Sequence, residues 1–166
     1  MRVAVKDACV LIDLANGELL DAWFQLGIDT FTTDLVIRQV KAEHQWKAVS
    51  AFVEAGLLHV ETLTGSQIEQ MTDILGGSRI GLEDQSALFL AIERKAILLT
   101  GDRRLRLQAG IHHVEVRGLL WVLDELVAHG LVPPSLVAVR LRSMRENGAR
   151  LPNDECEKRF RQWTDG

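Results

Sequence analysis

Short apolar segments alternate with longer amphipathic segments along this chain, and this alternation restricts its possible folds more than any other feature. Residues 96–100 (AILLT) are apolar up to the threonine, which is typical of a strand buried in a parallel sheet. Residues 2–5, 57–63 and 113–116 also predict strands, and segments with helical spacing of apolar residues separate all of them. The sequence therefore predicts an α/β fold.

The segments between the predicted strands place apolar side chains on one helical face. The longest predicted helix covers residues 35–55, after the Thr-Thr-Asp triplet at 32–34 has offered an N-cap. Further helices are predicted at 18–26, 66–75, 82–95, 103–109 and 119–128. Two more helices follow a pair of prolines, so we expect one domain over residues 1–132 with a helical extension, residues 133–166, packed on it.

Composition narrows the class of protein. A chain of 166 residues, 47% of them hydrophobic, suits one globular domain with a sizeable core. Only two cysteines occur, Cys9 and Cys156, which argues against a disulfide framework or a thiolate zinc site and fits a reducing cytoplasm. No run approaches the roughly 18 consecutive apolar residues of a membrane helix. We therefore expect a cytoplasmic protein without a membrane partner.

Acidic residues follow two of the predicted strands. Asp7 comes after the first strand, Asp102 after the strand at 96–100, and Asp84 lies in the first turn of a predicted helix. The carboxyl ends of parallel strands form the ligand crevice of an open sheet, so Asp7 and Asp102 are expected to converge there. Carboxylate oxygens suit Mg²⁺ or Mn²⁺, and a pair of such ions can activate water against a phosphodiester. Taken singly, each acid also has a structural explanation as a turn or helix-dipole residue.

Residues 81–111 (GLEDQSALFLAIERKAILLTGDRRLRLQAGI) resemble the C-terminal half of a PIN domain, the nuclease fold of many type II toxin–antitoxin toxins. Family members place one metal-binding Asp at the start of an Ala- and Leu-rich helix, and another after an apolar strand that closes in Thr-x-Asp. In this chain these positions hold Asp84 and Asp102, with Thr100 as the supporting threonine. The opening VKDACVLIDL resembles the family's first strand, with its acid at Asp7, and the likeness covers approximately residues 3–132.

The resemblance implies a three-layer PIN-like fold, with a central, mostly parallel sheet of four to five strands flanked by helices. It implies a metal-dependent endoribonuclease in which Asp7, Asp84 and Asp102 are the catalytic and metal-binding residues for Mg²⁺ or Mn²⁺. It further implies a homodimer and, for a toxin, inhibition by an antitoxin peptide that lies over the active-site groove.

Two positions depart from the family pattern. Cys9 stands where the family has a Ser, Asn or Thr that supports the metal cluster. The segment TDLVIRQV places Gln39 where the family has a metal-binding Glu, and glutamine keeps a carbonyl ligand but loses one negative charge. Glu43 lies one helical turn further along the predicted helix and could complete the ligand set in its place. The sequence therefore predicts either a modified nuclease centre or a degenerate one.

The charge distribution bears on RNA binding. The net charge of −4 combines an excess of acids in residues 1–93 with an excess of basic residues in 94–166. Arg103, Arg104 and Arg106 directly follow the last predicted site acid, where they would hold RNA phosphates; a solvated helix face explains them as well. Divalent ions in the crevice would offset the acids, so RNA binding is expected to depend on metal.

Three functions remain open from the sequence. The first is a metal-dependent endoribonuclease, the toxin of a toxin–antitoxin pair. The second is a PIN-fold protein that has lost metal affinity through Gln39 and serves as an RNA-binding or protein-interaction module. The third is a receiver domain, which also clusters acids at strand ends, but the acidic pair that it needs near the first strand is absent because Asp7 has no acidic neighbour.

Overall fold

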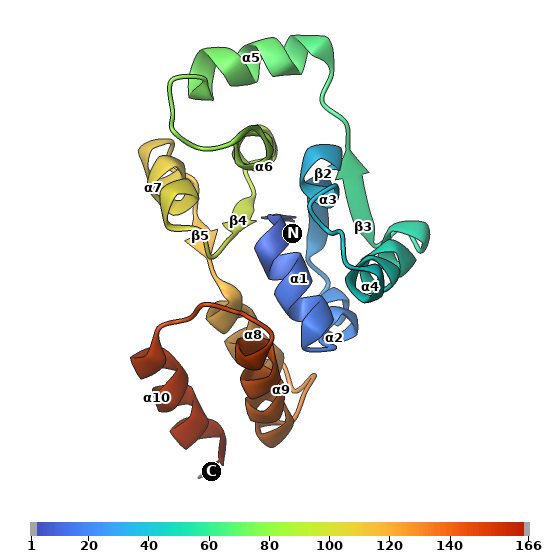
Figure 1. The fold of residues 1–166 in the computed structure, drawn as a ribbon, viewed down its shortest axis with the longest axis vertical. Helices are drawn as coiled ribbons and strands as arrows, with labels where there is room; N and C mark the ends of the chain where they lie inside the picture. Colours follow the sequence, from blue (N-terminus) through green and yellow to red (C-terminus); the bar gives the residue numbers. More distant parts are fainter. Residues whose placement is uncertain (1–2, 165–166) are drawn as a thin grey trace.

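Strand β1 (Val3–Lys6) lies at the centre of a parallel sheet whose strands are ordered β3-β2-β1-β4-β5. The computed structural model describes residues 3–164 (Figure 1). The other strands are β2 (Asp29–Thr33), β3 (Leu58–Glu61), β4 (Ile97–Leu99) and β5 (Val116–Arg117). Val5 of β1 lies opposite Phe31 of β2 and Leu98 of β4, and each neighbouring pair is parallel. Parallel pairing places the carboxyl ends of these strands at one edge of the sheet.

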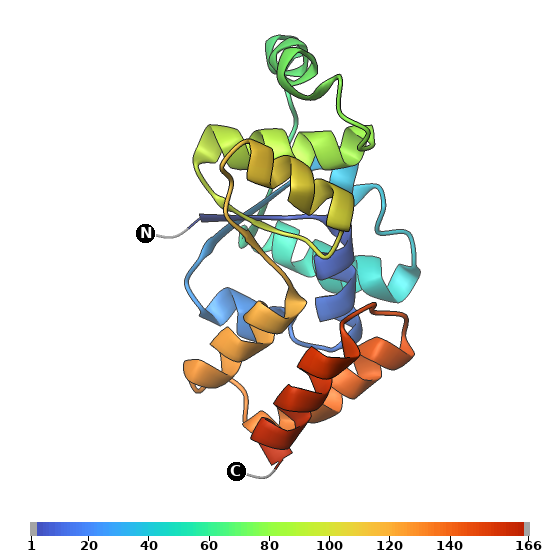
Figure 2. The ribbon, with the colours of Figure 1, turned by 90° about the vertical axis from the view of Figure 1, so that its left-hand side faces the viewer.

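Helices cover both faces of this sheet. Figure 2 shows α6 and α7 on one side of the strands and α1, α2 and α4 on the other, with α8, α9 and α10 beyond them. The helices are α1 (Ala8–Asn16), α2 (Leu20–Gln25), α3 (Asp34–Ile37), α4 (Glu43–Glu54), α5 (Gly65–Leu75), α6 (Leu82–Arg94), α7 (Arg103–Ile111), α8 (Leu119–Ala128), α9 (Pro134–Glu146) and α10 (Asn153–Thr164). The predicted three-layer α/β fold with a mostly parallel sheet of four to five strands is confirmed.

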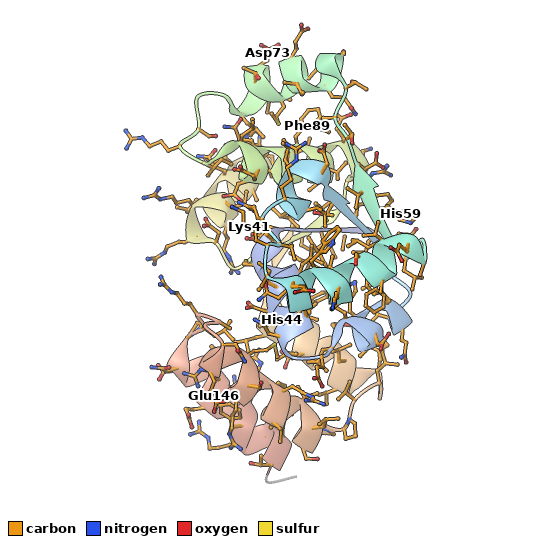
Figure 3. All side chains as sticks on the ribbon, turned by 45° about the vertical axis from the view of Figure 1, so that its right-hand side comes forward. Lys41, His44, His59, Asp73, Phe89 and Glu146 are labelled. Carbon is orange, nitrogen blue, oxygen red and sulfur yellow. The ribbon has the colours of Figure 1, made fainter. Side chains whose placement is uncertain are left out.

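Two hydrophobic clusters fill the space on either side of the sheet. Because side chains alternate along a strand, Ala4 joins the cluster beneath α1, α2 and α8, whereas Val5 joins the one beneath α6. Phe89 of α6 is fully buried in the second cluster (Figure 3). Burying a side chain of this size stabilises the fold by about 1.5–3 kcal/mol. The sheet is thereby held from both faces.

Strand β2 was not among the strands predicted from the sequence, because its buried side chains are polar. Thr30 and Thr32 are fully buried, and each satisfies its hydroxyl locally. Thr30 accepts a hydrogen bond from the indole nitrogen of Trp23 at 2.9 Å and donates to a backbone carbonyl. Thr32 donates to the carbonyl oxygen of Lys6 at 2.9 Å, which ties β2 to β1. A threonine-rich strand of this kind lacks the apolar run that marks a central strand.

The continuous helix predicted over residues 35–55 is wrong, because the chain leaves the helical path between α3 and α4. Residues 38–42 are not helical, and they turn the chain so that Val40 is buried in the core. Helix α4 then packs against α1, where His44 and Gln45 both contact the Asn16 side-chain oxygen, at 3.3 and 3.2 Å. Figure 3 shows Lys41 and His44 at this change of direction.

The last two helices share the first cluster with the rest of the fold. Met144 of α9 packs so closely on Gly17 that a β-carbon there would lie 2.8 Å from the methionine sulfur. Arg159 of α10 forms a two-pronged ion pair with Asp124 of α8, at 3.0 and 2.7 Å. Trp163 is buried in the same cluster. Within residues 3–164, no helix is long and apolar enough to cross a membrane.

Candidate functional site

Two acids, Asp7 and Asp102, follow the ends of the neighbouring strands β1 and β4. The Asp7 backbone nitrogen donates to the Leu99 carbonyl at 3.1 Å, which continues the strand pairing up to the acid itself. Asp7 also caps α1, since its Oδ1 accepts a hydrogen bond from the Cys9 nitrogen at 2.6 Å. Asp102 caps α7 in the same way, accepting from the Leu105 nitrogen at 2.9 Å. Each acid is therefore held at the junction of a strand and a helix.

Thr100 links the two acids. Its hydroxyl donates a hydrogen bond to Oδ2 of Asp7 and accepts one from the backbone nitrogen of Asp102 at 3.0 Å. Thr100 is fully buried, and Asp7 is only 4% exposed. The threonine thus occupies the supporting position that the Thr-x-Asp pattern suggested.

Helix α6 brings Asp84 to the same edge of the sheet. The hydroxyls of Ser86 and Thr33 lie 2.7 Å apart, which fixes the first turn of α6 against the end of β2. Burial, together with the carboxylates of Asp7 and Asp102, raises the pKa of Asp84 to about 6. The charges of Asp7 and Asp102 act on Asp84, so α6 carries this acid toward the edge of the sheet at which the other two stand.

The chemistry of these acids fits a hard divalent cation. Their oxygens are the ligands that Mg²⁺ and Mn²⁺ prefer. Among residues 3–164, none of the three forms an ion pair with Lys, Arg or His, so their repulsion has no protein counter-charge in direct contact. Within residues 3–164, no three side chains of Asp, Glu, His or Cys are close enough together in this arrangement to bind one ion. Ion binding would therefore draw the carboxylates closer together.

Cys9 lies beside the acids on the first turn of α1. Although Cys9 is exposed, desolvation of its sulfur and the Asp7 carboxylate both raise the pKa of the thiol, so the sulfur stays protonated at neutral pH. A β-carbon on Gly101 would lie 3.8 Å from this sulfur. The structure thus places Cys9 at the site, where a neutral thiol can accompany the metal ligands without adding charge.

Gln39 and Glu43 do not share a helix face, contrary to the sequence-based argument. Gln39 is exposed in the turn that follows α3, and its backbone nitrogen donates to the Val36 carbonyl at 3.0 Å. Glu43 begins α4, and its carboxylate pairs with Lys47 at 3.3 Å with its side chain 83% exposed. The interrupted helix removes the reason for placing Glu43 beside Gln39, and no contact joins either residue to Asp7 among the described side chains.

Asp13 is an acid near the site that the sequence did not single out. Burial and the carboxylate of Asp7 raise its pKa to about 6. It lies one helical turn after Cys9 on α1, so the helical spacing from Cys9 was the signal that could have found it. Asp13 therefore extends the negative potential of the site along α1.

Lys6, directly before Asp7, is also part of the surroundings of the site and was missed. Its ammonium nitrogen is fully buried, lies 3.5 Å from the centre of the Trp23 ring, and has no hydrogen-bond partner among the described residues. Burial lowers its pKa well below the ordinary value, and the neighbouring Asp7 opposes this shift. Its place two residues after Ala4 puts it on the same inward face of β1.

Arg103, Arg104 and Arg106 lie at the start of α7, immediately after Asp102, and all of them are exposed. Within the described chain none of them is ion-paired with a carboxylate. The structure therefore places unpaired cations next to the acidic edge of the sheet.

A family model described as a PIN domain (DUF3368) matches residues 3–165. The chain belongs to the PIN-domain family. The family match includes α9 and α10 and so extends past the residues, 3–132, in which the sequence alone suggested the likeness. A PIN domain is a nuclease fold, so the predicted resemblance to this family is confirmed at that level.

Solved structures of PIN-type proteins are similar to this PIN domain. PAE2754 from Pyrobaculum aerophilum superposes with a TM-score of 0.53 at 19% identity, over 76% of this chain and 98% of that chain. A PilT N-terminus domain protein, SSO1118 from Sulfolobus solfataricus P2, superposes with a TM-score of 0.46 at 14% identity, over 75% and 93% of the two chains. No curated protein matches the sequence significantly. At such identities the first likeness supports the fold of this PIN domain and nothing finer.

Replacing Asp84 with asparagine is expected to stabilise the metal-free PIN domain at pH 7.5. The folded state holds a proton on Asp84 up to about pH 6, whereas the unfolded chain releases it near 3.8, so this acid costs stability as the pH rises through that window. Urea unfolding of the wild type and Asp84→Asn should therefore differ at pH 7.5 and converge below pH 4. An equal difference at both pH values would contradict repulsion as the cause.

Proposed function

We propose that this PIN domain is a metal-dependent endoribonuclease. The observation that carries the proposal is the placement of Asp7 and Asp102 where β1 and β4 end, linked through the Thr100 hydroxyl. Among the described residues neither acid has a cationic partner in contact, and the charges of both help to raise the pKa of Asp84. Carboxylates that repel one another at the carboxyl edge of a parallel sheet are the arrangement expected for a cation site. Asp7, Asp84 and Asp102 would hold one or two Mg²⁺ or Mn²⁺ ions.

A bound divalent ion would lower the pKa of a water molecule and offset charge on the scissile phosphate. The chain's own residues set the geometry for this chemistry. Thr100 donates to one oxygen of Asp7 and the Cys9 nitrogen to the other, so the carboxylate cannot rotate freely. Asp102 is fixed by the Leu105 nitrogen, which leaves its second oxygen available to a ligand. Attack of water on phosphorus with departure of the 3′ oxygen gives a 5′-phosphate and a 3′-hydroxyl.

RNA is the substrate class that we propose, because exposed cations border the acids. Arg103 and Arg104 follow Asp102 directly and can contact the phosphates on either side of the cleaved bond. Such contacts position a strand without reading its sequence. Divalent ions bound at the acids would also reduce the repulsion between the site and RNA.

We further propose that the protein acts as the toxin of a toxin–antitoxin pair, as a homodimer in the cytoplasm. An antitoxin peptide that covers the acidic edge would block RNA from reaching Asp84. Co-expression with the product of a neighbouring gene should then relieve growth inhibition by the wild type. A neighbour that relieves no inhibition, beside a wild type that does inhibit growth, would contradict the antitoxin part of the proposal.

The proposal is tested by cleavage of a labelled single-stranded RNA with Mn²⁺, with Mg²⁺ and with EDTA. We expect cleavage only with a divalent ion, products with 5′-phosphates, and loss of cleavage in Asp102→Asn. Asparagine can still accept the Leu105 hydrogen bond, so this variant should keep its helix cap and fold normally. Lys41→Met, on the exposed turn before α4, serves as a variant outside the site. A correctly folded wild type that cleaves no RNA with either ion would reject the enzyme in favour of a degenerate PIN module.

A further inference from the structure

Arg106 differs from the other arginines of α7 because its head group is held at the site. Its Nη2 lies 3.5 Å from the backbone carbonyl oxygen of Thr100, the residue whose hydroxyl links Asp7 and Asp102. Arg103 and Arg104 have no corresponding contact among the described residues. The guanidinium of Arg106 is therefore positioned by the same residue that positions the acids.

Gly118 provides the space for this guanidinium. A β-carbon at this position would lie 3.3 Å from Nη2 of Arg106, which is closer than ordinary van der Waals contact, and 3.7 Å from the Thr100 carbonyl oxygen. The backbone of Gly118 has φ −111° and ψ −175°, an extended conformation that any residue adopts. A β-carbon at Gly118 would therefore shift the guanidinium by a few tenths of an ångström, although the backbone conformation itself accepts any residue.

The remaining donors of Arg106 are free for an anion. No carboxylate forms an ion pair with Arg106 in the described part of the chain, although Asp102 lies four residues before it. A guanidinium has five donor hydrogens in a rigid fork that matches two oxygens of a phosphate. The Thr100 carbonyl contacts one edge of the Arg106 guanidinium, so the other edge is already oriented before a ligand binds. This orientation reduces the entropy lost on binding.

We propose that Arg106 binds the scissile phosphate of the RNA at the acidic centre, and that Gly118 determines where its guanidinium lies. The inference rests on the proposed nuclease function and deepens it by separating Arg106 from the general phosphate contacts of Arg103 and Arg104. Charge that develops on the phosphate oxygens during hydrolysis strengthens a fixed, bidentate contact more than a mobile one. Arg106 therefore acts mainly on kcat, and Arg104 mainly on KM.

A double-mutant cycle between Gly118 and Arg106 tests this inference. Arg106→Ala is expected to lower kcat for RNA cleavage about 100-fold, the range measured when one fixed donor to developing charge is lost. Arg106→Lys should recover only part of this loss, since a lysine is a single point charge. Gly118→Ala should lower kcat several-fold, because the added carbon displaces the guanidinium by a few tenths of an ångström. In the Arg106→Ala background the same glycine substitution should cost nothing further.

Two variants supply matched controls. Gly110→Ala adds a methyl group on the same helix as Arg106, at a position with no atom within 4 Å of the new carbon, and should leave kcat unchanged. Arg104→Ala removes a neighbouring charge and should raise KM in a way that increasing salt suppresses. Equal, salt-sensitive increases of KM in Arg104→Ala and Arg106→Ala, with kcat unchanged in both, would overturn the special role of Arg106. A full effect of Gly118→Ala without Arg106 would overturn the role of the glycine.

A binding measurement separates this inference from the nuclease proposal. Anisotropy of a fluorescent single-stranded RNA of about ten nucleotides, a length within the usual single-strand site size, is recorded with Ca²⁺ in place of Mn²⁺. Weaker binding by Arg106→Ala and Gly118→Ala than by the control Gly110→Ala, in a protein that never cleaves RNA, would reject the nuclease and support the phosphate contact. RNA cleavage by the wild type with unaltered binding and kcat in Arg106→Ala would reject the contact and keep the nuclease. A wild type that neither binds nor cleaves RNA would overturn both.

Discussion

Replacing Asp7 with asparagine is expected to lower metal-dependent RNA cleavage by about 1,000-fold, the upper end of what loss of one fixed electrostatic group costs. Asp7 is 4% exposed and stands at the point where the hydrogen bonds from Thr100 and the Cys9 nitrogen meet. Asparagine keeps one oxygen as an acceptor and is an equally good helix N-cap, so the fold should survive. The substitution removes the negative charge and one carboxylate ligand. The oxygen that keeps the Cys9 hydrogen bond remains, while the amide nitrogen faces the Thr100 hydroxyl as a donor.

A comparison with Asp7→Ala separates the charge of Asp7 from its role in the fold. Alanine removes the N-cap of α1 as well, which costs about 1 kcal/mol of unfolding free energy, and leaves the Thr100 hydroxyl without its acceptor. Both variants should lose cleavage and Mn²⁺ binding by calorimetry, whereas only the alanine variant should unfold at lower urea. Cleavage within tenfold of the wild type in a folded Asp7→Asn protein would exclude Asp7 from the centre.

Replacing Lys6 with methionine is expected to raise the free energy of unfolding at pH 7 by about 1–3 kcal/mol, the cost of burying a polar group without a partner. Methionine fills a similar volume and packs on an indole ring as an apolar side chain. In the wild type, the Lys6 nitrogen lies over the face of the Trp23 ring and has no hydrogen-bond acceptor among the described residues. The stabilisation therefore comes from removing an unsatisfied donor.

The pH dependence of this effect gives a sharper test. The folded pKa of Lys6 lies below that of the unfolded chain, so the unfolded state binds more protons between the two values, and stability rises with pH there until the unfolded lysine also deprotonates near 10.5. The advantage of Lys6→Met should consequently shrink between pH 7 and pH 10 in urea titrations. Lys41→Met, on an exposed turn, should change stability little at any pH. A methionine variant less stable than the wild type throughout would show that the amine has a favourable role in the fold.

The strands that could be predicted from the sequence are those whose buried side chains are apolar. Ile97–Leu99 is apolar and follows a helix with a regular apolar face, so both the strand and the acid after it were identified. Asp29–Thr33 buries hydroxyls that bond across the sheet, and such a strand becomes visible only when its partners are known. Long-range hydrogen bonding of this kind leaves no periodic pattern within the strand itself.

The acids of the site could be placed in advance because each one follows or begins a regular element. Asp7 and Asp102 end strands, and their positions follow from parallel topology alone. The roles of Arg106 and Gly118 could not be found in this way, because they depend on a contact of a few ångströms between segments separated along the chain. The error at Glu43 has a similar origin. The break in the helix at residues 38–42 changes the direction of the chain, so helical spacing no longer relates Glu43 to Gln39.

The order in which the core is completed has a consequence for synthesis on the ribosome. One cluster joins Ala4 near the start of the chain to Cys156, Phe160 and Trp163 near its end. Translation delivers these residues after the other members of the cluster, and a domain generally folds as one unit. The apolar faces of α1 and α8 therefore remain partly uncovered until α10 has left the exit tunnel.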